Sequence, residues 1–178
     1  LNKAKKVRPE GASENDDWSM QVVLVDHHFI DLLNIELVSG RSFSTAFSTD
    51  ATEAVILNEA AVKALGWRNP IARTFETYYL NHGWKSAYKK GKVIGVVKDT
   101  HFESLHRSVA PTVFTLSPDG FDYYLVKTGP DHIQETLSFL EATWRKMAKG
   151  SPLEYTFLDD RFDALSRAEE KLNTVFAC

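Results

Sequence analysis

The chain has 178 residues, of which 43% are hydrophobic and 25% charged, a composition that suits one soluble globular domain or two small subdomains. Its formal net charge of −3 gives no general electrostatic footprint for nucleic acid. No stretch approaches the roughly 20 apolar residues that a membrane-spanning helix needs. The single cysteine, Cys178, excludes a disulfide within the chain.

The first 19 residues are polar and include Pro9 and Gly11, so we expect a poorly ordered N-terminal segment. The apolar run from Met20 to Val25 then predicts a strand. Asp26 is placed to cap a short helix. Three elements are expected next: a helix at 28–33, a strand at 35–38 and a Ser/Thr-rich loop at 42–53.

The stretch from Ala54 to Phe75 predicts a strand, a cap, a helix and a stop. A short apolar run over 54–57 is typical of a buried strand. Asn58 follows at the position of an N-cap, and an alanine-rich helix continues to Leu65. Gly66 stands where a left-handed residue usually ends a helix.

Residues 74–117 predict further extended segments. Four are expected in order: a strand at 74–80, a polar hairpin-like insert at 81–91, a strand at 92–97 and an extended segment at 109–116. Asp99 or Thr100 can cap a helix of at most two turns over 102–105.

The C-terminal part has a different pattern. The segment from His132 to Ala148 is the clearest helix, because its apolar residues recur at spacings of 3 and 4 and form one stripe: Ile133, Leu137, Leu140, Trp144 and Met147. Strands are predicted on either side, at 123–127 and 153–157. Asp159 or Asp160 can cap a last helix from Arg161 onward. This order predicts a βαβ-type unit, with the helix face buried on its sheet.

Candidate chemistry is sparse. The metal-like residues are Asp26, His27, His28, Asp99 and His101, but their spacing matches no metal signature, and both aspartates also suit caps. The chain has neither a phosphate-binding G-x-x-x-x-G-K-[ST] loop nor a G-x-S-x-G nucleophile turn. We therefore expect no catalytic, cofactor-binding or metal-binding residues, and no enzymatic activity.

Aromatic residues in and beside the polar insert are candidates for a contact surface, since a large exposed apolar patch marks such sites. The candidates are Trp67, Tyr78, Trp84 and Tyr88.

Four motifs stand together in the chain: V-D-x-x-F…L-x-x-G-R-x-F, NEAAVKALGW-x-NPIARTF, GKVIGVVKDTHFESLH and VAPTVF. In this order they resemble the extracytoplasmic domain of an ABC-transporter permease of the MacB/FtsX type, from about Val22 to the C-terminus. Two residues depart from that family's pattern. Ala72 stands where the N-P-I-G turn usually has glycine, and Thr100 where an aromatic residue often follows the aspartate.

The resemblance implies an α+β fold with a small mixed β-sheet subdomain at 20–117 (Sabre-like) and a β-α-β-α porter-like unit at 118–178. In the family, the second unit joins a matching half encoded upstream. The last helix would be a stalk that carries Phe162, Leu165 and Leu172 and continues into a membrane helix. Membrane helices would also flank the chain.

The implied function is to transmit ATP-driven motion of the membrane helices to a substrate or a periplasmic partner. The domain would face the periplasm from the inner membrane. A cytoplasmic ATPase would use the ATP. The partners would be this ATPase and a second permease copy or repeat, with a periplasmic protein or lipoprotein as a further candidate. Two alternatives remain open: a ligand-binding sensory domain, which a closed apolar cavity would favour, and a metal-dependent hydrolase, which a shared metal site would favour.

Overall fold

The structure is a computed structural model that describes residues 3–13, 15–16, 18–80, 86–100, 108–117, 123–148 and 150–160. These residues belong to two compact units, which meet in the sequence between Tyr123 and Tyr124. The sheet and the short helices lie in the first unit, and the long helix lies in the second. The α+β class expected from the sequence is therefore confirmed.

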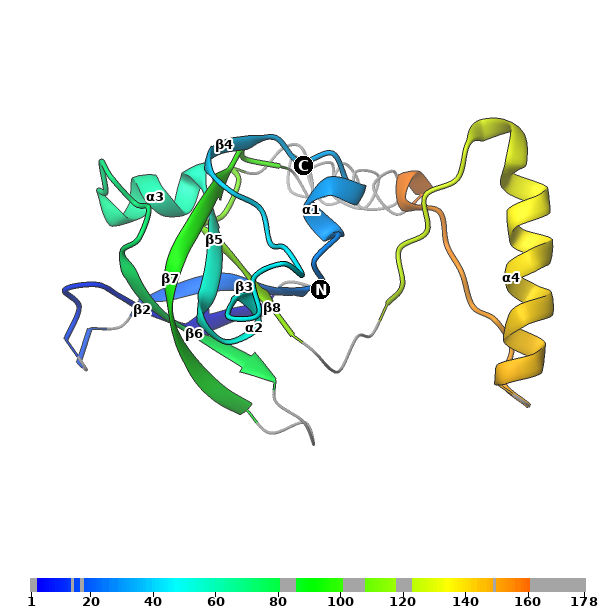
Figure 1. The fold of residues 1–178 in the computed structure, drawn as a ribbon, viewed down its shortest axis with the longest axis horizontal. Helices are drawn as coiled ribbons and strands as arrows, with labels where there is room; N and C mark the ends of the chain where they lie inside the picture. The colour runs from blue at the N-terminus through cyan, green and yellow to red at the C-terminus, as the bar shows by residue number, and fades with distance from the viewer. Residues whose placement is uncertain are drawn as a thin grey trace, which may run out of the picture. The chain divides into compact units, whose positions relative to one another are not determined.

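The first unit is built on one eight-stranded mixed sheet (Figure 1). Its strands are β1 (Lys3–Lys6), β2 (Arg8–Pro9), β3 (Ser19–Val25), β4 (Leu37–Gly40), β5 (Ala54–Asn58), β6 (Thr74–Leu80), β7 (Ser86–Val97) and β8 (Thr112–Leu116). The order is β1-β3-β8-β5-β7-β6-β2, with β4 added to β7. The pairs β3–β8 and β5–β7 are parallel, and the others are antiparallel.

The N-terminal segment closes this sheet. β1 and β2 stand at opposite ends of the strand order, yet only Val7 separates them in the chain. Val7 donates its backbone N–H to Trp18 O at 3.0 Å, and its side chain is 1% exposed. Because one continuous segment pairs with β3 at one end of the order and with β6 at the other, the sheet curls into a barrel, in which β2 covers the edge of β6 at Phe75 and Glu76.

The expectation of a poorly ordered segment at residues 1–19 is therefore wrong for residues 3–9. The run Lys3-Ala-Lys-Lys6 lacks the alternating apolar pattern of a strand that packs on a core. It is held by register pairs with β3, from Lys3 opposite Val22 to Lys6 opposite Ser19. Such nonlocal backbone pairing can order a segment whose own sequence has no strand pattern.

One core cluster of the first unit lies on the face of the sheet that carries Val55 and Leu57. Its buried residues are Val7, Met20, Val22, Val55, Leu57, Ala61, Phe75, Val93 and Val113. Ala61 comes from helix α3 (Glu59–Leu65), which follows β5 directly and packs on this face. The strands predicted at 20–25, 54–57, 74–80 and 109–116 are present, within three residues at their ends. The strand predicted at 92–97 is also present, but it is longer and begins six residues earlier, at Ser86 of β7.

Several other segments differ from the expectation. The strand predicted at 35–38 begins two residues later, as β4. The loop predicted at 42–53 ends in a short helix, α2 (Asp50–Glu53), while α1 (Phe29–Leu32) lies within the predicted helix. The polar insert belongs in part to β7, which pairs with β6 as a hairpin. The short helix predicted at 102–105 lies outside the described residues.

The second unit has one long helix, α4 (Ile133–Met147), preceded by a 3-10 turn η1 (Pro130–His132). The helix is confirmed, but its apolar stripe is only half-buried, and no residue of α4 is buried. The segments 123–127 and 153–157 are not strands, contrary to the prediction. A strand needs a neighbour to satisfy its backbone groups, and the described residues of this unit supply none. The final helix from Arg161 lies outside the described residues.

Ala72, which stands where the N-P-I-G turn usually has glycine, has an unusual backbone conformation. Ala72 has a φ of +67°, in the left-handed region that an alanine side chain disfavours. The motif that this chain resembles has glycine at this point. We expect Ala72→Gly to raise the free energy of unfolding by up to about 1 kcal/mol, since relief of the strain exceeds the extra entropy lost by glycine. Urea denaturation measures the change.

The matched control is Gly66→Ala. Gly66 has a φ of +65° and no atom within 4 Å of an added Cβ, so the substitution adds the strain without a clash. It should lower the free energy of unfolding by about 1 kcal/mol. A destabilised Ala72→Gly variant would show that the turn does not store this strain.

Candidate functional site

The first polar site joins β5, α3 and β8 through Asn58. Its side-chain Oδ1 accepts from Ala61 N at 2.9 Å, which caps α3 as predicted, and from Thr112 N at 2.8 Å. Its Nδ2 donates to Ala110 O at 3.0 Å. The residue is 3% exposed, so these bonds are shielded from water. Asn58 therefore fixes where the helix begins and where the strand β8 enters the sheet.

A second side chain, the carboxylate of Asp99, bonds to the start of the same helix. Asp99 Oδ1 accepts from Ala60 N at 2.9 Å, and Asp99 N donates to Glu59 Oε2 at 3.2 Å. Asp99 or Thr100 was predicted to cap a helix at 102–105, which lies outside the described residues, and the described contacts of Asp99 are with the start of α3. At the other end Gly66 takes the left-handed conformation that the sequence predicts. These positions belong to the motifs that carry the family resemblance, and their contacts here organise the fold.

The third polar site is a buried ion pair. Arg41 donates to both carboxylate oxygens of Asp50, each at 2.7 Å, and Ser44 N donates to Asp50 Oδ2 at 3.1 Å. Asp50 is 1% exposed. Burial by itself raises the pKa of Asp50. The hydrogen bonds from Arg41 and Ser44, together with the charges of Arg41 and His27, have the larger opposite effect, so the pKa is lowered overall. The guanidinium also stacks 3.9 Å from the ring centroid of Phe47. This pair closes the loop that leads into α2.

Lys89 lies beneath α2 and is 4% exposed. Its Nζ donates to Asp50 O and to Thr115 Oγ1, both at 3.2 Å. Burial lowers the pKa of Lys89 to about 8, and the charge of Asp50 limits the fall. Thr77, directly opposite on β6, has a buried hydroxyl that finds no hydrogen-bond partner among the residues that the structure describes. A lysine with a lowered pKa can act as a nucleophile, but this one is enclosed, so its contacts are structural.

The buried amine makes stability depend on pH. In the unfolded chain the pKa of Lys89 is near 10.5, above its folded value of about 8, so the unfolded state binds more protons between these values. We expect the free energy of unfolding to rise as the pH increases from 8 to 10.5, by up to about 3 kcal/mol from this residue. Lys89→Met should remove that rise, whereas Lys63→Met, at an exposed position of α3, should keep it. Urea denaturation across this pH range measures the effect, and equal slopes in both variants would contradict it.

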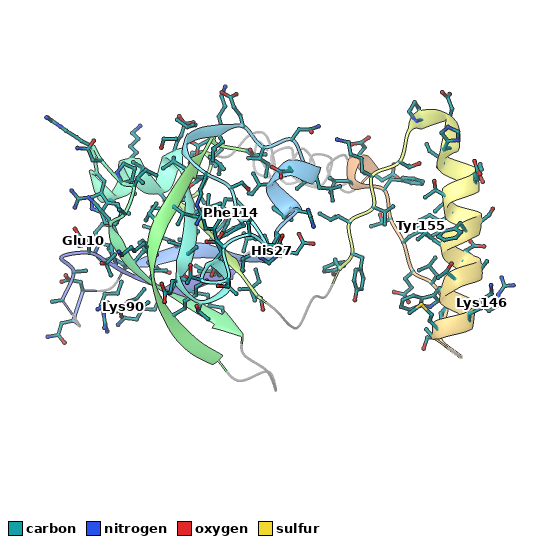
Figure 2. All side chains as sticks on the ribbon, viewed as in Figure 1. Glu10, His27, Lys90, Phe114, Lys146 and Tyr155 are labelled. Atoms are coloured by element: carbon teal, nitrogen blue, oxygen red, sulfur yellow. The ribbon has the colours of Figure 1, made fainter. Side chains whose placement is uncertain are left out.

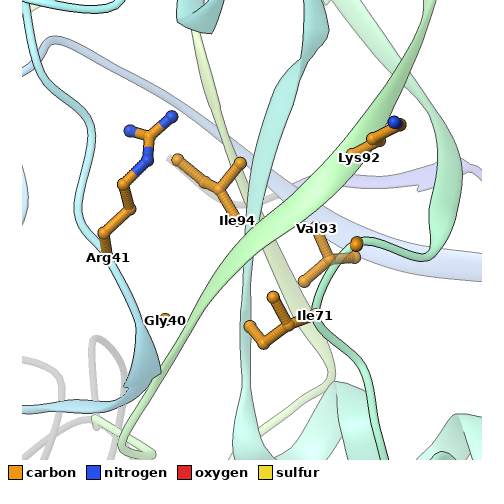
Figure 3. Close-up of a pocket in the computed structure, with 7 residues that line it drawn as sticks. Gly40, Arg41, Ile71, Lys92, Val93 and Ile94 are labelled. Carbon is orange, nitrogen blue, oxygen red and sulfur yellow. The ribbon is translucent and has the colours of Figure 1, made fainter.

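A shallow, open depression of about 400 Å³ lies where β7 passes from β6 to β4 (Figure 3). Its lining comes from Gly40, Arg41, Ile71, Ala72, Lys92, Val93 and Ile94. The lining is mostly apolar, and the guanidinium of Arg41 is already paired with Asp50. The depression offers no convergent set of polar groups of the kind that orients a small ligand.

The predicted contact aromatics are only partly described. Trp67 is half-buried and packs edge-on against the core residue Phe75, at 6.3 Å between ring centroids. Tyr78 and Tyr88 are opposite each other in the β6–β7 register. Trp84 and the stalk residues Phe162, Leu165 and Leu172 lie outside the described residues. The contact surface stays a prediction, with Trp67 contributing mainly to the core.

The predicted metal-like residues are not brought together in the part of the chain that the structure describes. Among those residues no group of three His, Cys, Asp or Glu side chains could hold a metal ion. Asp26 accepts from His28 N at 3.0 Å, which orders the start of α1. His101 lies outside the described residues.

Apolar side chains of the second unit are exposed, among them Met147 of the α4 stripe that was predicted to be buried. Tyr124 is 82% exposed, and others with substantial exposure are Leu125, Val126, Phe139, Met147, Tyr155, Phe157 and Leu158. Figure 2 shows Tyr155 on the segment that follows α4. Few contacts within the unit offset this exposure: Trp144 Nε1 donates to Ser151 O at 3.0 Å, and Tyr155 packs edge-on against Phe157. Among the described residues, no helix is both long and apolar enough to cross a membrane.

Known structures share this fold. One is the periplasmic region of MacB from Actinobacillus actinomycetemcomitans, with a TM-score of 0.61 and 14% identity over 92% of this chain and 72% of the other. Another is the extracellular domain of the noncanonic ABC-type transporter YknZ from Gram-positive bacteria. Its TM-score is 0.56 and its sequence identity 13%, over 85% of this chain and 74% of the other.

A domain of a putative permease from Porphyromonas gingivalis gives a TM-score of 0.53 and 13% identity over 87% of this chain and 76% of the other. No family model and no curated protein sequence matches the chain. The chain therefore has the fold of extracytoplasmic domains of ABC-type transporter permeases, as its motifs suggested.

Proposed function

We propose that this chain is the extracytoplasmic domain of an ABC-transporter permease and that it transmits ATP-driven motion of the membrane helices to a substrate or a partner outside the membrane. The observation that carries the proposal is the shared fold with the periplasmic region of MacB over 92% of the chain. It is joined by the contacts of Asn58, Gly66 and Asp99, which occupy the motif positions that suggested the family.

The described site chemistry agrees with a mechanical role. Asp50 and Lys89 are buried and Arg41 is partly exposed, and their bonds to one another, to the backbone and to Thr115 fasten loops to the sheet. The depression beside Arg41 is open. The structural neighbours are transporter domains rather than enzymes. No observation in the described residues favours the sensory-domain or hydrolase alternative.

In this proposal a separate cytoplasmic ATPase binds and hydrolyses ATP, and the present domain uses no cofactor. A second permease copy or repeat completes the transporter, and a periplasmic protein or lipoprotein is the partner outside the membrane. Residues 161–178 form the stalk that connects the domain to a membrane helix. A helix of that length reaches on the order of 25 Å, at about 1.5 Å per residue.

Location is the first property to test. Lys63→Cys places a thiol on the exposed side of α3, and Cys178→Ser removes the native one. In intact spheroplasts that express the full-length protein, a membrane-impermeant maleimide should label this thiol. The Cys178→Ser protein without the added cysteine is the control. Labelling that requires lysis of the inner membrane would place the domain in the cytoplasm and overturn the proposal.

A further inference from the structure

The core face of the sheet continues into a polar layer. Side chains two or four positions apart on a strand point to the same face. Three polar residues stand at this spacing from core residues of their own strands: Thr77 from Phe75 on β6, Thr115 from Val113 on β8, and Lys89 from Val93 on β7. Each of the three is at most 4% exposed. Two hydroxyls and one amine are therefore enclosed beside the apolar core.

The hydrogen bonds of this polar layer are incomplete. A protonated lysine has three N–H donors. Lys89 Nζ uses two of them, to Asp50 O and to Thr115 Oγ1, both at 3.2 Å, and in the described part of the chain the third has no partner. The hydroxyl of Thr77 is 0% exposed and is likewise unpaired there. Both groups therefore have unused hydrogen-bonding capacity in a place that is shielded from bulk water.

These two groups are neighbours, yet they do not bond to each other. Thr77 and Lys89 face each other in the β6–β7 register, and such cross-strand neighbours have Cβ atoms about 5 Å apart. Thr77 Oγ1 is nevertheless beyond hydrogen-bond distance of Lys89 Nζ, because the amine is directed to Asp50 O and Thr115 Oγ1. A single bridging atom that both accepts and donates would complete the bonding of both groups.

We propose that an internal water molecule binds between Lys89 Nζ and Thr77 Oγ1. It accepts the third N–H of the ammonium group and donates to the hydroxyl oxygen of Thr77. Two polar partners are the minimum that holds a buried water, and such waters typically bond to buried groups that are otherwise unsatisfied. The water extends the contacts of Lys89 with α2 and β8 to β6. The site lies within the first unit and does not depend on the proposed transporter role.

The sign of one stability change distinguishes a hydrated site from a dry one. Thr77→Val keeps the shape of the side chain and removes the hydroxyl. In a dry site this substitution removes a buried group that has no partner, so the urea midpoint should rise. In the hydrated site it removes a satisfied group and leaves the water with one bond fewer, so the midpoint should fall. The matched control is Thr74→Val, at a half-buried position of the same strand, which should leave the midpoint unchanged.

A crystal structure of the 178-residue chain tests the ligand directly. Crystals grown with sodium bromide should show a water within about 3.2 Å of both Lys89 Nζ and Thr77 Oγ1, without an anomalous bromide signal. Thr77→Ser keeps the hydroxyl and should keep the water, so it serves if the valine variant does not fold. A raised midpoint for Thr77→Val or no density between the two atoms would overturn the proposal. An anomalous peak at this position would also overturn it and identify a halide site.

Discussion

Asn58→Ala is expected to lower the free energy of unfolding by about 3 kcal/mol. The substitution removes three hydrogen bonds at a position that is 3% exposed, and it leaves Ala61 N, Thr112 N and Ala110 O without that partner. Loss of a helix cap costs about 1 kcal/mol, and each buried group left unsatisfied costs about 1 kcal/mol or more. The midpoint and slope of a urea titration measure the change.

Two further substitutions separate the contributions. Asn58→Asp keeps the oxygen that Ala61 N and Thr112 N donate to but loses the donor to Ala110 O, so its cost should be smaller than that of alanine. Asn69→Ala changes an exposed asparagine and should alter stability by less than about 0.5 kcal/mol. If the Asn58→Ala and Asn69→Ala variants unfolded at the same urea concentration, Asn58 would not join β5, α3 and β8.

Removal of Arg41 should destabilise the fold by a similar amount. Arg41→Met leaves the carboxylate of Asp50, which is 1% exposed, without its bidentate partner. Breaking a buried ion pair from one side costs about 3–5 kcal/mol, and we expect the lower end because the Arg41 side chain is itself 36% exposed. Arg41→Lys keeps a charge but not the two parallel bonds, so its cost should be intermediate.

The pH dependence of this variant identifies the cause. Arg41 helps lower the pKa of Asp50, so the pair contributes stability that is present above about pH 4 and is lost as the pH falls through the lower, folded value. Without Arg41, burial raises the pKa of Asp50. The difference in unfolding free energy between the parent and Arg41→Met should therefore begin to shrink above about pH 4, as Asp50 of the variant is protonated at its raised pKa, and should shrink further below about pH 4 as the parent loses its ion pair. A difference that stays constant to pH 2 would mean that the lost packing of Arg41 on Phe47 is the cause.

The features that the sequence predicts well are those set by neighbours in the chain. Asn58 and Gly66 bound a short helix through contacts within a few residues, and the apolar run before them is a buried strand. The long-range contacts of Asn58 cannot be predicted from neighbouring residues. The bonds of Asn58 to Ala110 and Thr112 reach across more than 50 positions, and nothing local indicates them.

The errors have the same origin. The lysine-rich start has no strand pattern of its own and is a strand because β3 pairs with it. The opposite holds at 123–127 and 153–157, where apolar patterns predict strands but the described residues give them no pairing partner. The stripe on α4 is likewise a correct helix pattern whose predicted burial fails. Local sequence indicates what a segment can form, and pairing decides whether it does.

The most direct test of the mechanical role is a distance measurement in the full-length transporter. Spin labels at Lys63→Cys, in a Cys178→Ser background, would report the separation between α3 of the two permease copies in the presence of the partner ATPase. The account predicts that the distance distribution differs between the nucleotide-free and the ATP-bound states. Identical distributions in a transporter that binds and hydrolyses ATP would show that the domain does not receive the motion, and would contradict the proposal.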